Sequence, residues 1–486
     1  MRKGTNKRTR SFLWIVPCAL IILIPLLFPL PIEIIDVFSL APVSGFDVHI
    51  NFWRIVFEPF VGPLLYFNRS FYPLQEIPIA IFWVLGLYSL YTLIRVFKLP
   101  SWDPRKKKLG SFLGNFLLLV GIGFSIFVLL LFIPLPNNTI INNSPDQILV
   151  STHAHTEYSH DGLTSQKNMW KWQKRNGFDA FFITDHANFN KTLEFSQRQR
   201  NGEFPMDPLV LVGQEHSGSN HMSLLGLNGA FVTKDRPDPE IVDLVHQNGG
   251  AVIINHWFNG KGKEKEFYKD LGADGFEIEN VGKELYYDRG IFEEIKSFCE
   301  ENGLIMVGGL DYHGYGRVCA IWNAFTIPNW HEMDPDAKEG TILQILRERD
   351  QSKVQVLMYK DRPYCDGKNL LFSPFSTAIN YFRTLNGYQV ASWVVWISLF
   401  RLLWVFGRKR FMSSEKSLAF FGLGSALFLV ILGGFYFVRA QAIKGYSKVF
   451  AEYSSLLLTI GAIFLIYCMF MIYMRFVRKD KTWKRD

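Results

Sequence analysis

The hydrophobic positions of this chain follow two different patterns. Near both ends, apolar residues form runs that approach or exceed the roughly 20 residues a helix needs to cross a bilayer; these runs cover residues 12–32, 77–97, 112–134, 390–406, 418–438 and 453–474. Between residues 137 and 385, apolar runs are short and alternate with polar stretches. The pattern predicts a membrane region with three spans at 1–136, an inserted globular domain at 137–385, and a second membrane region with three spans at 386–486.

One apolar segment does not fit the spanning pattern. Residues 52–67 are apolar, yet they contain Arg54, Glu58, Pro59 and Pro63. Irregular backbone at membrane depth is tolerated only where protein or water covers it. An interfacial or re-entrant segment is therefore favoured over a seventh span.

The middle region has the alternation typical of an α/β fold. Short apolar runs such as residues 209–213 and 251–254 end beside Glu or His, and polar helix-like stretches such as residues 289–303 separate them. Strand–helix repetition with polar residues at the strand ends predicts a barrel-like α/β domain whose site lies at the C-terminal rim of the strands.

Composition and charge sharpen this picture. The 486 residues are 49% hydrophobic and 20% charged, whereas soluble proteins average about a quarter charged residues; a purely soluble enzyme, a coiled coil and a disordered regulator are excluded. The net charge of +8 collects in four basic segments on one side of a six-span arrangement, at residues 1–10, 95–108, 407–416 and 475–485. Because Lys and Arg favour cytoplasmic loops, we expect a multi-pass protein of the cytoplasmic (plasma) membrane with cytoplasmic termini, an extracytoplasmic domain and no nucleic-acid partner.

Histidines carry the main chemical signal. Nine of the eleven lie between His153 and His313. His153 and His155 are two positions apart at the end of an apolar strand, so both side chains point to one face. Further polar residues follow other expected strand ends: Asp185, His186, Glu215, His221, His256, Asp311 and His313. Imidazole and carboxylate are donors that zinc, manganese and iron take in proteins, so the pattern predicts a site for divalent metal ions.

Five motifs resemble, in order, those of the PHP (polymerase and histidinol phosphatase) superfamily: HAHTEYSHDG at 153–162, ITDH at 183–186, GQEHSGSNHMSLLGL at 213–227, NHW at 255–257 and GLDYHG at 309–314. The resemblance covers roughly residues 148–330 and does not extend to the flanking apolar runs. It implies a distorted (β/α)7 barrel that holds two to three divalent metal ions (zinc, manganese or iron) and hydrolyses phosphoesters.

The resemblance also implies three sets of metal ligands. The first metal would be held by His153, His155, Glu215 and Asp311. Glu215 would bridge to a second metal, held by His221 and His256. A third would be held by His186 and His313, with His160 or Asp161 completing the set.

The choice between His160 and Asp161 is open because this chain departs from the commonest pattern of the family. Many members have Ser-Asp-Gly where this chain has Ser159-His160-Asp161-Gly162. His160 has the usual spacing from His155, so it is the preferred ligand, with Asp161 as the alternative.

Other residues near the motifs receive supporting roles. Catalysis is assigned to Glu215 and Asp311 together with Arg317. Arg317, Lys261 and Lys263 are candidate phosphate clamps, and Asp185 could orient a neighbouring ligand. Three more polar residues end another apolar strand, where contact with substrate or metal and packing of the strand are both open: Glu277, Glu279 and Asn280.

These features together predict a membrane-embedded, metal-dependent phosphoesterase that hydrolyses a phosphate ester with a metal-activated water. One helix already anchors a domain effectively irreversibly. The surplus of spans therefore suggests a substrate or partner in the membrane, such as a phospholipid or a lipid-linked head group. The alternative is a non-catalytic receptor or transporter-associated domain that retains the metal site.

The orientation can be tested by cysteine labelling. In intact cells or spheroplasts, Lys234→Cys should react with a membrane-impermeant thiol reagent and Lys107→Cys should not, because positive-inside bias keeps the second residue in the cytoplasm. After permeabilisation both should react. The reverse pattern in intact cells would contradict the topology and the extracytoplasmic domain.

Overall fold

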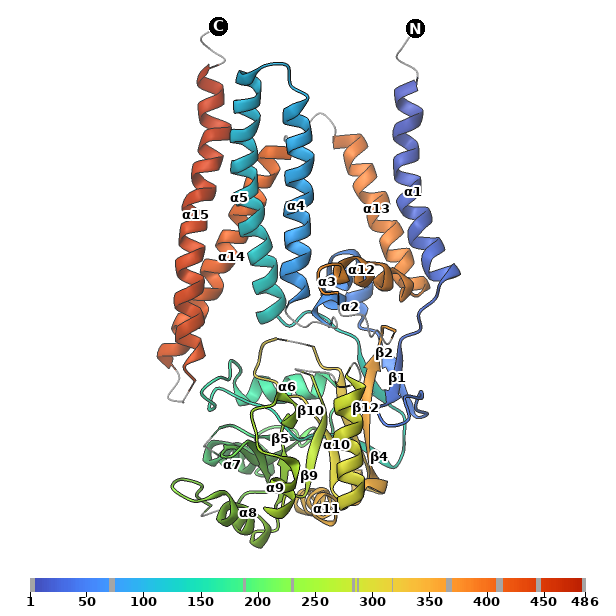
Figure 1. Ribbon diagram of the computed structural model, residues 1–486, viewed down its shortest axis with the longest axis vertical. Coiled ribbons are helices and arrows are strands. Elements are labelled where there is room, and N and C mark those ends of the chain that lie inside the picture. Colours follow the sequence, from blue (N-terminus) through green and yellow to red (C-terminus); the bar gives the residue numbers. More distant parts are fainter. Residues whose placement is uncertain are drawn as a thin grey trace.

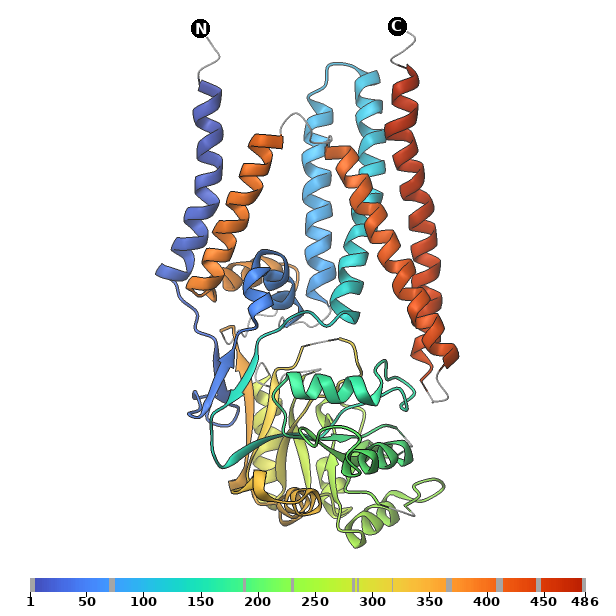
Figure 2. The same ribbon diagram turned by 180° about the vertical axis from the view of Figure 1, so that it is seen from behind.

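The computed structural model describes residues 5–69, 75–186, 189–228, 231–281, 285, 288–316, 318–363, 369–407, 414–442 and 447–482. Long helices stand side by side on one side of an α/β domain (Figures 1 and 2). Helices α1 (Thr5–Leu27) and α15 (Val449–Thr482) have their outer ends away from this domain, where α4 (Glu76–Phe97) also turns into α5 (Trp102–Phe132). The two ends of the described chain therefore lie opposite the α/β domain.

Within the described residues, five helices are long and apolar enough to cross a membrane: Glu76–Phe97, Trp102–Phe132, Gly387–Phe406, Glu415–Ala442 and Val449–Phe476. They belong to α4, α5, α13 (Gly387–Gly407), α14 (Ser414–Ala442) and α15. The expected span at 12–32 stays a prediction: α1 covers Thr5–Leu27, and the part of it whose side chains the structure describes, Trp14–Leu27, is apolar. The membrane association predicted from the apolar runs is thus supported by five helices instead of six.

The ambiguous segment at 52–67 forms two short helices, α2 (Phe52–Val56) and α3 (Glu58–Asn68). At about 1.5 Å per residue, the eleven residues of α3 extend roughly 16 Å, which is half a bilayer core. Both lie beside α12 (Ser373–Arg383) at the end of the helices that faces the α/β domain (Figure 1). Neither helix crosses a membrane by itself.

The α/β domain is built on one sheet, which contains ten strands within the described residues. In spatial order they are β1 (Glu33–Asp36), β12 (Val354–Lys360), β11 (Ile321–Thr326), β4 (Gln147–Ser151), β5 (Ala180–Ile183), β6 (Leu209–Ser217), β7 (His221–Leu225), β8 (Ala251–Ile254), β9 (Gly275–Asn280) and β10 (Ile305–Gly309). A separate pair joins β2 (Phe46–His49) to β3 (Thr139–Asn142). The helices of the domain are α6 (Gln166–Arg175), α7 (Asn190–Arg200), α8 (Asp238–Gln247), α9 (Lys265–Asp270), α10 (Arg289–Asn302) and α11 (Pro335–Glu348).

The α/β class is confirmed, but a (β/α)7 barrel is not. The pairs β1–β12, β12–β11, β11–β4, β6–β7 and β7–β8 are antiparallel, so the sheet is mixed and curled. The strand order also reaches beyond the expected domain, because β1 comes from the segment before residue 137 and pairs with β12.

The two sides of the curled sheet meet just beyond β4 and β10. The backbone N–H of His155 donates to the carbonyl of Tyr312 at 2.9 Å, and that of Asp311 donates to the carbonyl of His153 at 3.2 Å. Farther down, the buried Asn323 amide bridges β4 and β10: it accepts from the Gly308 N–H at 2.6 Å and donates to the carbonyls of Val150 and Gly308. A side chain and two loop segments thus close the sheet where strand pairing stops.

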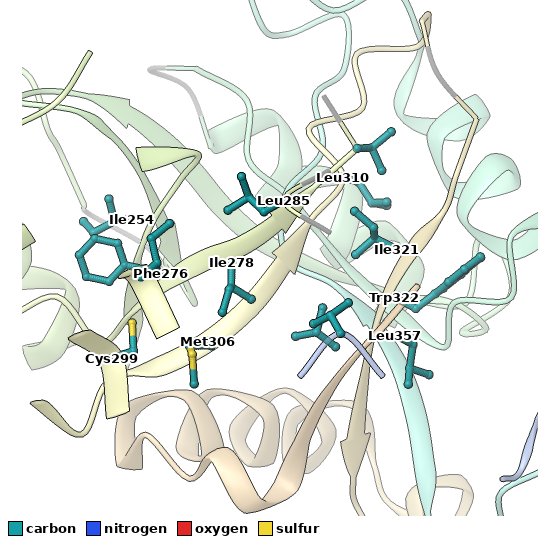
Figure 3. Packing of buried hydrophobic residues seen from close by; sticks show 14 of the residues in the cluster. Ile254, Phe276, Ile278, Leu285, Cys299, Met306, Leu310, Ile321, Trp322 and Leu357 are labelled. Carbon is teal, nitrogen blue, oxygen red and sulfur yellow. The ribbon is translucent and has the colours of Figure 1, made fainter. Parts of the chain in front are cut away.

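Apolar side chains from the strands fill the domain interior. Ile254, Phe276, Ile278, Met306 and Trp322 are all buried, and Figure 3 shows them packed from neighbouring strands. Strands covered on both sides read as continuous apolar runs, which is why short runs without strict alternation marked them in the sequence. This rigid core positions the loops at the strand ends.

Buried ion pairs and hydrogen bonds join the edge of the sheet, the short helices α2 and α3, and α12. Arg69 lies 3.4 Å from Asp361, just after β12, and donates to the carbonyl of Tyr359 at 2.7 Å. Arg54 lies 3.5 Å from Glu58, which accepts from the hydroxyl of Tyr381 in α12 at 2.9 Å. Buried charges are tolerated only when paired, so these contacts attach α2, α3 and α12 to the edge of the sheet.

The role of Asn323 in closing the sheet predicts a stability effect. Asn323→Ala leaves buried backbone groups of Gly308 and Val150 without their partners, and should lower the free energy of unfolding by about 2–4 kcal/mol. Asn248→Ala, at an exposed helix end, should change it by about 0.5 kcal/mol or less. Denaturant unfolding of the full chain in detergent measures both. Equal losses in the two variants would contradict the bridging role.

Candidate metal centre

The candidate ligands converge at one rim of the sheet. Most of them follow a strand at its C-terminal end: His153 and His155 after β4, His186 after β5, Glu215 near the end of β6, His256 after β8, and Asp311 and His313 after β10. His221 begins β7, which runs antiparallel to β6, so it lies at the same rim. The sheet topology therefore assembles residues that are up to 160 positions apart, from 153 to 313.

The first set of ligands is buried and tightly packed. His153 Nε2 and His155 Nε2 lie 3.0 Å apart, and each is 3.3 Å from Asp311 Oδ1. The two oxygens of Glu215 lie 3.3 Å and 3.2 Å from the same two nitrogens. Two imidazole nitrogens face each other here, so a proton or a metal ion must lie between them to relieve the repulsion of their lone pairs.

Glu215 is the centre of the cluster. Besides His153 and His155, its carboxylate is approached by His186 Nε2 at 3.1 Å, His221 Nδ1 at 3.0 Å and His256 Nε2 at 3.5 Å. The amide of Asn255 donates to it at 2.8 Å. Five imidazoles and an amide exceed the roughly four lone-pair sites of one carboxylate, so proton-mediated hydrogen bonds alone do not account for the arrangement.

Three overlapping groups have the spacing of metal ligands: His153, His155, Glu215 and Asp311; His155, Asp161 and His186; and His186, Glu215 and His221. The groups share Glu215, His155 and His186, as expected for ions that lie close together. Their mixture of imidazole and carboxylate suits zinc, manganese or iron. The residues present therefore fit a divalent metal centre.

The far nitrogens of the imidazoles strengthen this interpretation. His153 Nδ1 lies 2.8 Å from Glu277, His186 Nδ1 lies 3.3 Å from the Ser217 hydroxyl, and His313 Nδ1 lies 2.7 Å from the Asp311 carbonyl. In each ring, Nε2 then points into the cluster. Metal-binding histidines characteristically use their second nitrogen in this way, which fixes the ring orientation.

The electrostatics of the cluster favour a bound cation. Burial by itself would lower the pKa of His155, but hydrogen bonds to Asp311 and Glu215 raise it to about 10. Burial would likewise raise the pKa of Glu215, yet the charge of His153 and the surrounding imidazoles hold it well below its usual range. Carboxylates that stabilise a positive charge on neighbouring imidazoles this strongly also stabilise a bound metal ion, for the same electrostatic reason.

The geometry favours Asp161 over His160 as the remaining ligand. Asp161 Oδ2 lies 3.0 Å from His313 Nε2 and 3.6 Å from His186 Nε2. The His160 side chain is 57% exposed, against 23% for Asp161. At Gly162 an added Cβ would lie 1.9 Å from the Thr156 carbonyl, so only glycine allows the turn that directs Asp161 inward. The geometry thus favours Asp161, and the choice between the two side chains stays a prediction.

Glu277 and Asn255 are the residues that sequence reasoning left without a definite role. Glu277 is buried; it contacts His153 and also accepts from the backbone N–H of His256 at 2.9 Å. Asn280 donates to Glu277 at 3.1 Å, whereas Glu279 accepts from the backbone of Leu285. Position at a strand end was the only sequence signal for Glu277 and Asn280, and Asn255 had no signal beyond its place beside His256.

The remaining polar residues of the motifs have structural contacts. Asp185 accepts from the backbone N–H and, at 2.6 Å, the hydroxyl of Thr156, so it anchors the loop after His155 and does not orient His186. His216 lies 3.1 Å from Asp238, and His246 lies 2.9 Å from Asp274. These two histidines contact carboxylates outside the cluster.

A cleft of about 560 Å³ opens beside the cluster. Asp161, His186, Glu215, Asp311 and His313 line it. Its wall also includes Lys261, as expected for a phosphate clamp. Lys263 is not part of the lining; its ammonium lies over the ring of Phe267 at 4.1 Å. Arg317 lies outside the described residues, so its expected role stays a prediction.

A comparison with protein families identifies this region. Residues 151–225 match the family model of the PHP domain. The match contains the first two of the five motifs and most of the third, with His153, His155, Asp161, His186, Glu215 and His221. The resemblance of the motifs to this family is thus confirmed. A comparison with curated proteins gives no match.

Solved structures resemble parts of the chain at low identity. A two-domain protein from Bacteroides vulgatus that contains a predicted PHP-like metal-dependent phosphoesterase is 15% identical; 47% of this chain and 69% of that chain are covered, with a TM-score of 0.34. PsfC from Pseudomonas syringae is 17% identical; the match covers 38% of this chain and 84% of that chain, with a TM-score of 0.29. An amidohydrolase from Chromobacterium violaceum, with bound sulfate and no metal, is 14% identical; the match covers 39% of this chain and 96% of that chain, with a TM-score of 0.28. At these TM-scores the family assignment rests on the matched segment and its motifs.

The choice between Asp161 and His160 predicts different metal contents. Asp161→Asn removes a negative charge that faces His186 and His313, and should reduce bound metal by about one equivalent per chain. His160→Gln should retain the wild-type content, because this side chain lies outside the cluster. Elemental analysis of protein purified without chelator measures both, and loss of metal in His160→Gln alone would reverse the assignment.

Proposed function

We propose that the protein is a membrane-held, metal-dependent phosphoesterase. The observation that carries the proposal is the buried Glu215 carboxylate, which is surrounded by five imidazoles in a segment that matches the PHP domain. A structural core has no need to place so many titratable groups around one carboxylate. An open cleft next to them gives a substrate access.

The chemistry follows from the ligands. Divalent metal ions bound here would supply a hydroxide from water near neutral pH and would neutralise charge on a phosphoryl group. His153, His155 and Asp311 would hold the first ion, Glu215 would bridge to a second held by His221 and His256, and Asp161, His186 and His313 would hold a third. Within this arrangement, Glu277 keeps the His153 ring in the orientation that points Nε2 at the cluster.

The cleft supplies the means of binding a phosphate ester. Lys261 is the one Lys or Arg in the cleft lining that the structure describes, and the lining also contains three carboxylates of the cluster, Asp161, Glu215 and Asp311. An ammonium in this position would bind a phosphoryl oxygen as a point charge. We assign phosphate binding to Lys261 and not to Lys263, whose ammonium is engaged with Phe267.

A Glu215→Gln variant tests the proposal. It removes the charge that the histidines share, so p-nitrophenol release from p-nitrophenyl phosphate and bis-p-nitrophenyl phosphate should fall to the level of chelator-treated wild-type protein. Glu240→Gln, which alters an exposed carboxylate that pairs with Arg236 on α8, should keep wild-type activity. The full chain in detergent, supplied with zinc or manganese, is the sample.

The same experiment separates the enzyme from the alternative of a non-catalytic receptor or transporter-associated domain. Wild-type protein that binds metal stoichiometrically but hydrolyses no phosphoester would favour the alternative. Full activity of Glu215→Gln with unchanged metal content would contradict the bridging role of this residue.

A further inference from the structure

The loops that carry Asp161 and His313 are attached to the ends of three membrane helices. In both ribbon views, the lower ends of α5, α14 and α15 lie next to the part of the α/β domain that contains the site loops (Figures 1 and 2). The contacts between them are specific and involve backbone groups. They place one side of the metal cluster directly against the membrane region.

The first attachment holds the loop of Asp161. The Ser447 hydroxyl donates to the carbonyl of Gly162 at 2.7 Å, and the backbone N–H of Lys448 donates to the carbonyl of His160 at 2.8 Å. Both neighbours of Asp161 are therefore held by the two residues that precede α15. In addition, Arg439 in the last turn of α14 pairs with Glu157 in the same loop.

The second attachment holds the segment after His313. The backbone N–H of Gly316 donates to the carbonyl of Leu131 near the end of α5 at 2.8 Å. The ring of Tyr315 packs against Phe132 of α5 and Tyr453 of α15, with ring centres 5.9 Å and 5.7 Å apart. His313 is thus two residues from an aromatic contact with two membrane helices.

Helix length sets the depth of these contacts. The apolar helices Glu415–Ala442 and Val449–Phe476 have 28 residues each, or about 42 Å at 1.5 Å per residue. A bilayer is about 30 Å thick in its hydrocarbon core and about 40–45 Å with its headgroups. Arg439, Ser447 and Lys448 at the domain-side ends therefore lie at headgroup depth, and the loop of Asp161 is bonded to them.

We propose that the substrate is a membrane phospholipid, whose headgroup phosphate enters the cleft from the bilayer surface. This inference rests on the proposed phosphoesterase function and specifies its substrate class. In the reaction a water oxygen would form a bond to phosphorus and one P–O ester bond would break. The departing oxygen would take the proton that the water gives up, and no oxidant or reductant is needed.

A soluble ester would not require this arrangement. One helix would anchor the domain, and a flexible linker would let the site diffuse in solvent. Instead, two loops that carry candidate ligands are fixed to helix ends at headgroup depth. The geometry keeps the cluster within reach of lipid phosphates and restricts its motion away from the surface.

The substrate class is tested with lipids and their deacylated counterparts. Full-length protein is reconstituted into phosphatidylcholine vesicles that contain phosphatidic acid or phosphatidylglycerol, and glycerol 3-phosphate or glycerophosphoglycerol is supplied in solution to vesicles without these lipids. We expect at least a ten-fold higher kcat/KM for a lipid than for its deacylated counterpart. At constant bulk concentration of the lipid substrate, added phosphatidylcholine should lower the rate. The added lipid dilutes the substrate within the bilayer, and the enzyme responds to the amount of substrate per area of membrane.

The outcomes distinguish the two proposals. Hydrolysis of the soluble esters at equal or higher efficiency, or of p-nitrophenyl phosphate but neither lipid, would overturn the lipid substrate and leave the phosphoesterase intact. Hydrolysis of none of these compounds by metal-loaded protein would overturn the phosphoesterase function itself.

A measurement of depth is independent of activity. A fluorophore on His160→Cys should be quenched by lipids that carry a spin label on the headgroup, because this loop is bonded to Lys448. The same fluorophore on Asp336→Cys in α11, at the end of the domain away from the helices (Figure 1), should not be. Equal, weak quenching at both positions would place the site away from the bilayer surface and overturn the inference.

Discussion

The structure depends on one buried carboxylate. Glu215 lies inside the domain at the end of β6, where an uncompensated negative charge would be strongly unfavourable. Imidazoles from the ends of β4, β5 and β8 and from the start of β7 surround it, so each of these elements must arrive at the same rim in the correct register. The cation that such a cluster attracts is then a part of the fold as well as of the chemistry.

The closure of the sheet and the assembly of the site involve the same residues. His153, His155 and Asp311 make the backbone hydrogen bonds that join the segments after β4 and β10, and their side chains form the first set of ligands. Asn323 completes the closure below them. A change in the contacts between the segments after β4 and β10 therefore moves the ligands. Metal binding should in turn hold these two segments together.

The domain and the membrane helices form a continuous structure. Arg69 with Asp361 links the end of α3 to the edge of the sheet, and Arg54 with Glu58 links α2 to α3. Ser447, Lys448 and Gly316 link the site loops to α5 and α15. The two sets of contacts lie on different parts of the domain. Together they restrict its rotation relative to the helices, so the cleft keeps a constant relation to the long apolar helices.

The sequence by itself determined the α/β class, the membrane character and nearly every candidate ligand, because helix length, strand hydrophobicity and strand-end position are local properties. It did not determine the antiparallel strands or the pairing of β1 with β12, which depend on partners distant in the chain. Only the tertiary structure favoured Asp161 over His160, since the turn at Gly162 and the contact with Lys448 decide which side chain faces inward. For the same reason, Glu277 and Asn255 gained their roles only when the strands brought them beside His153 and Glu215.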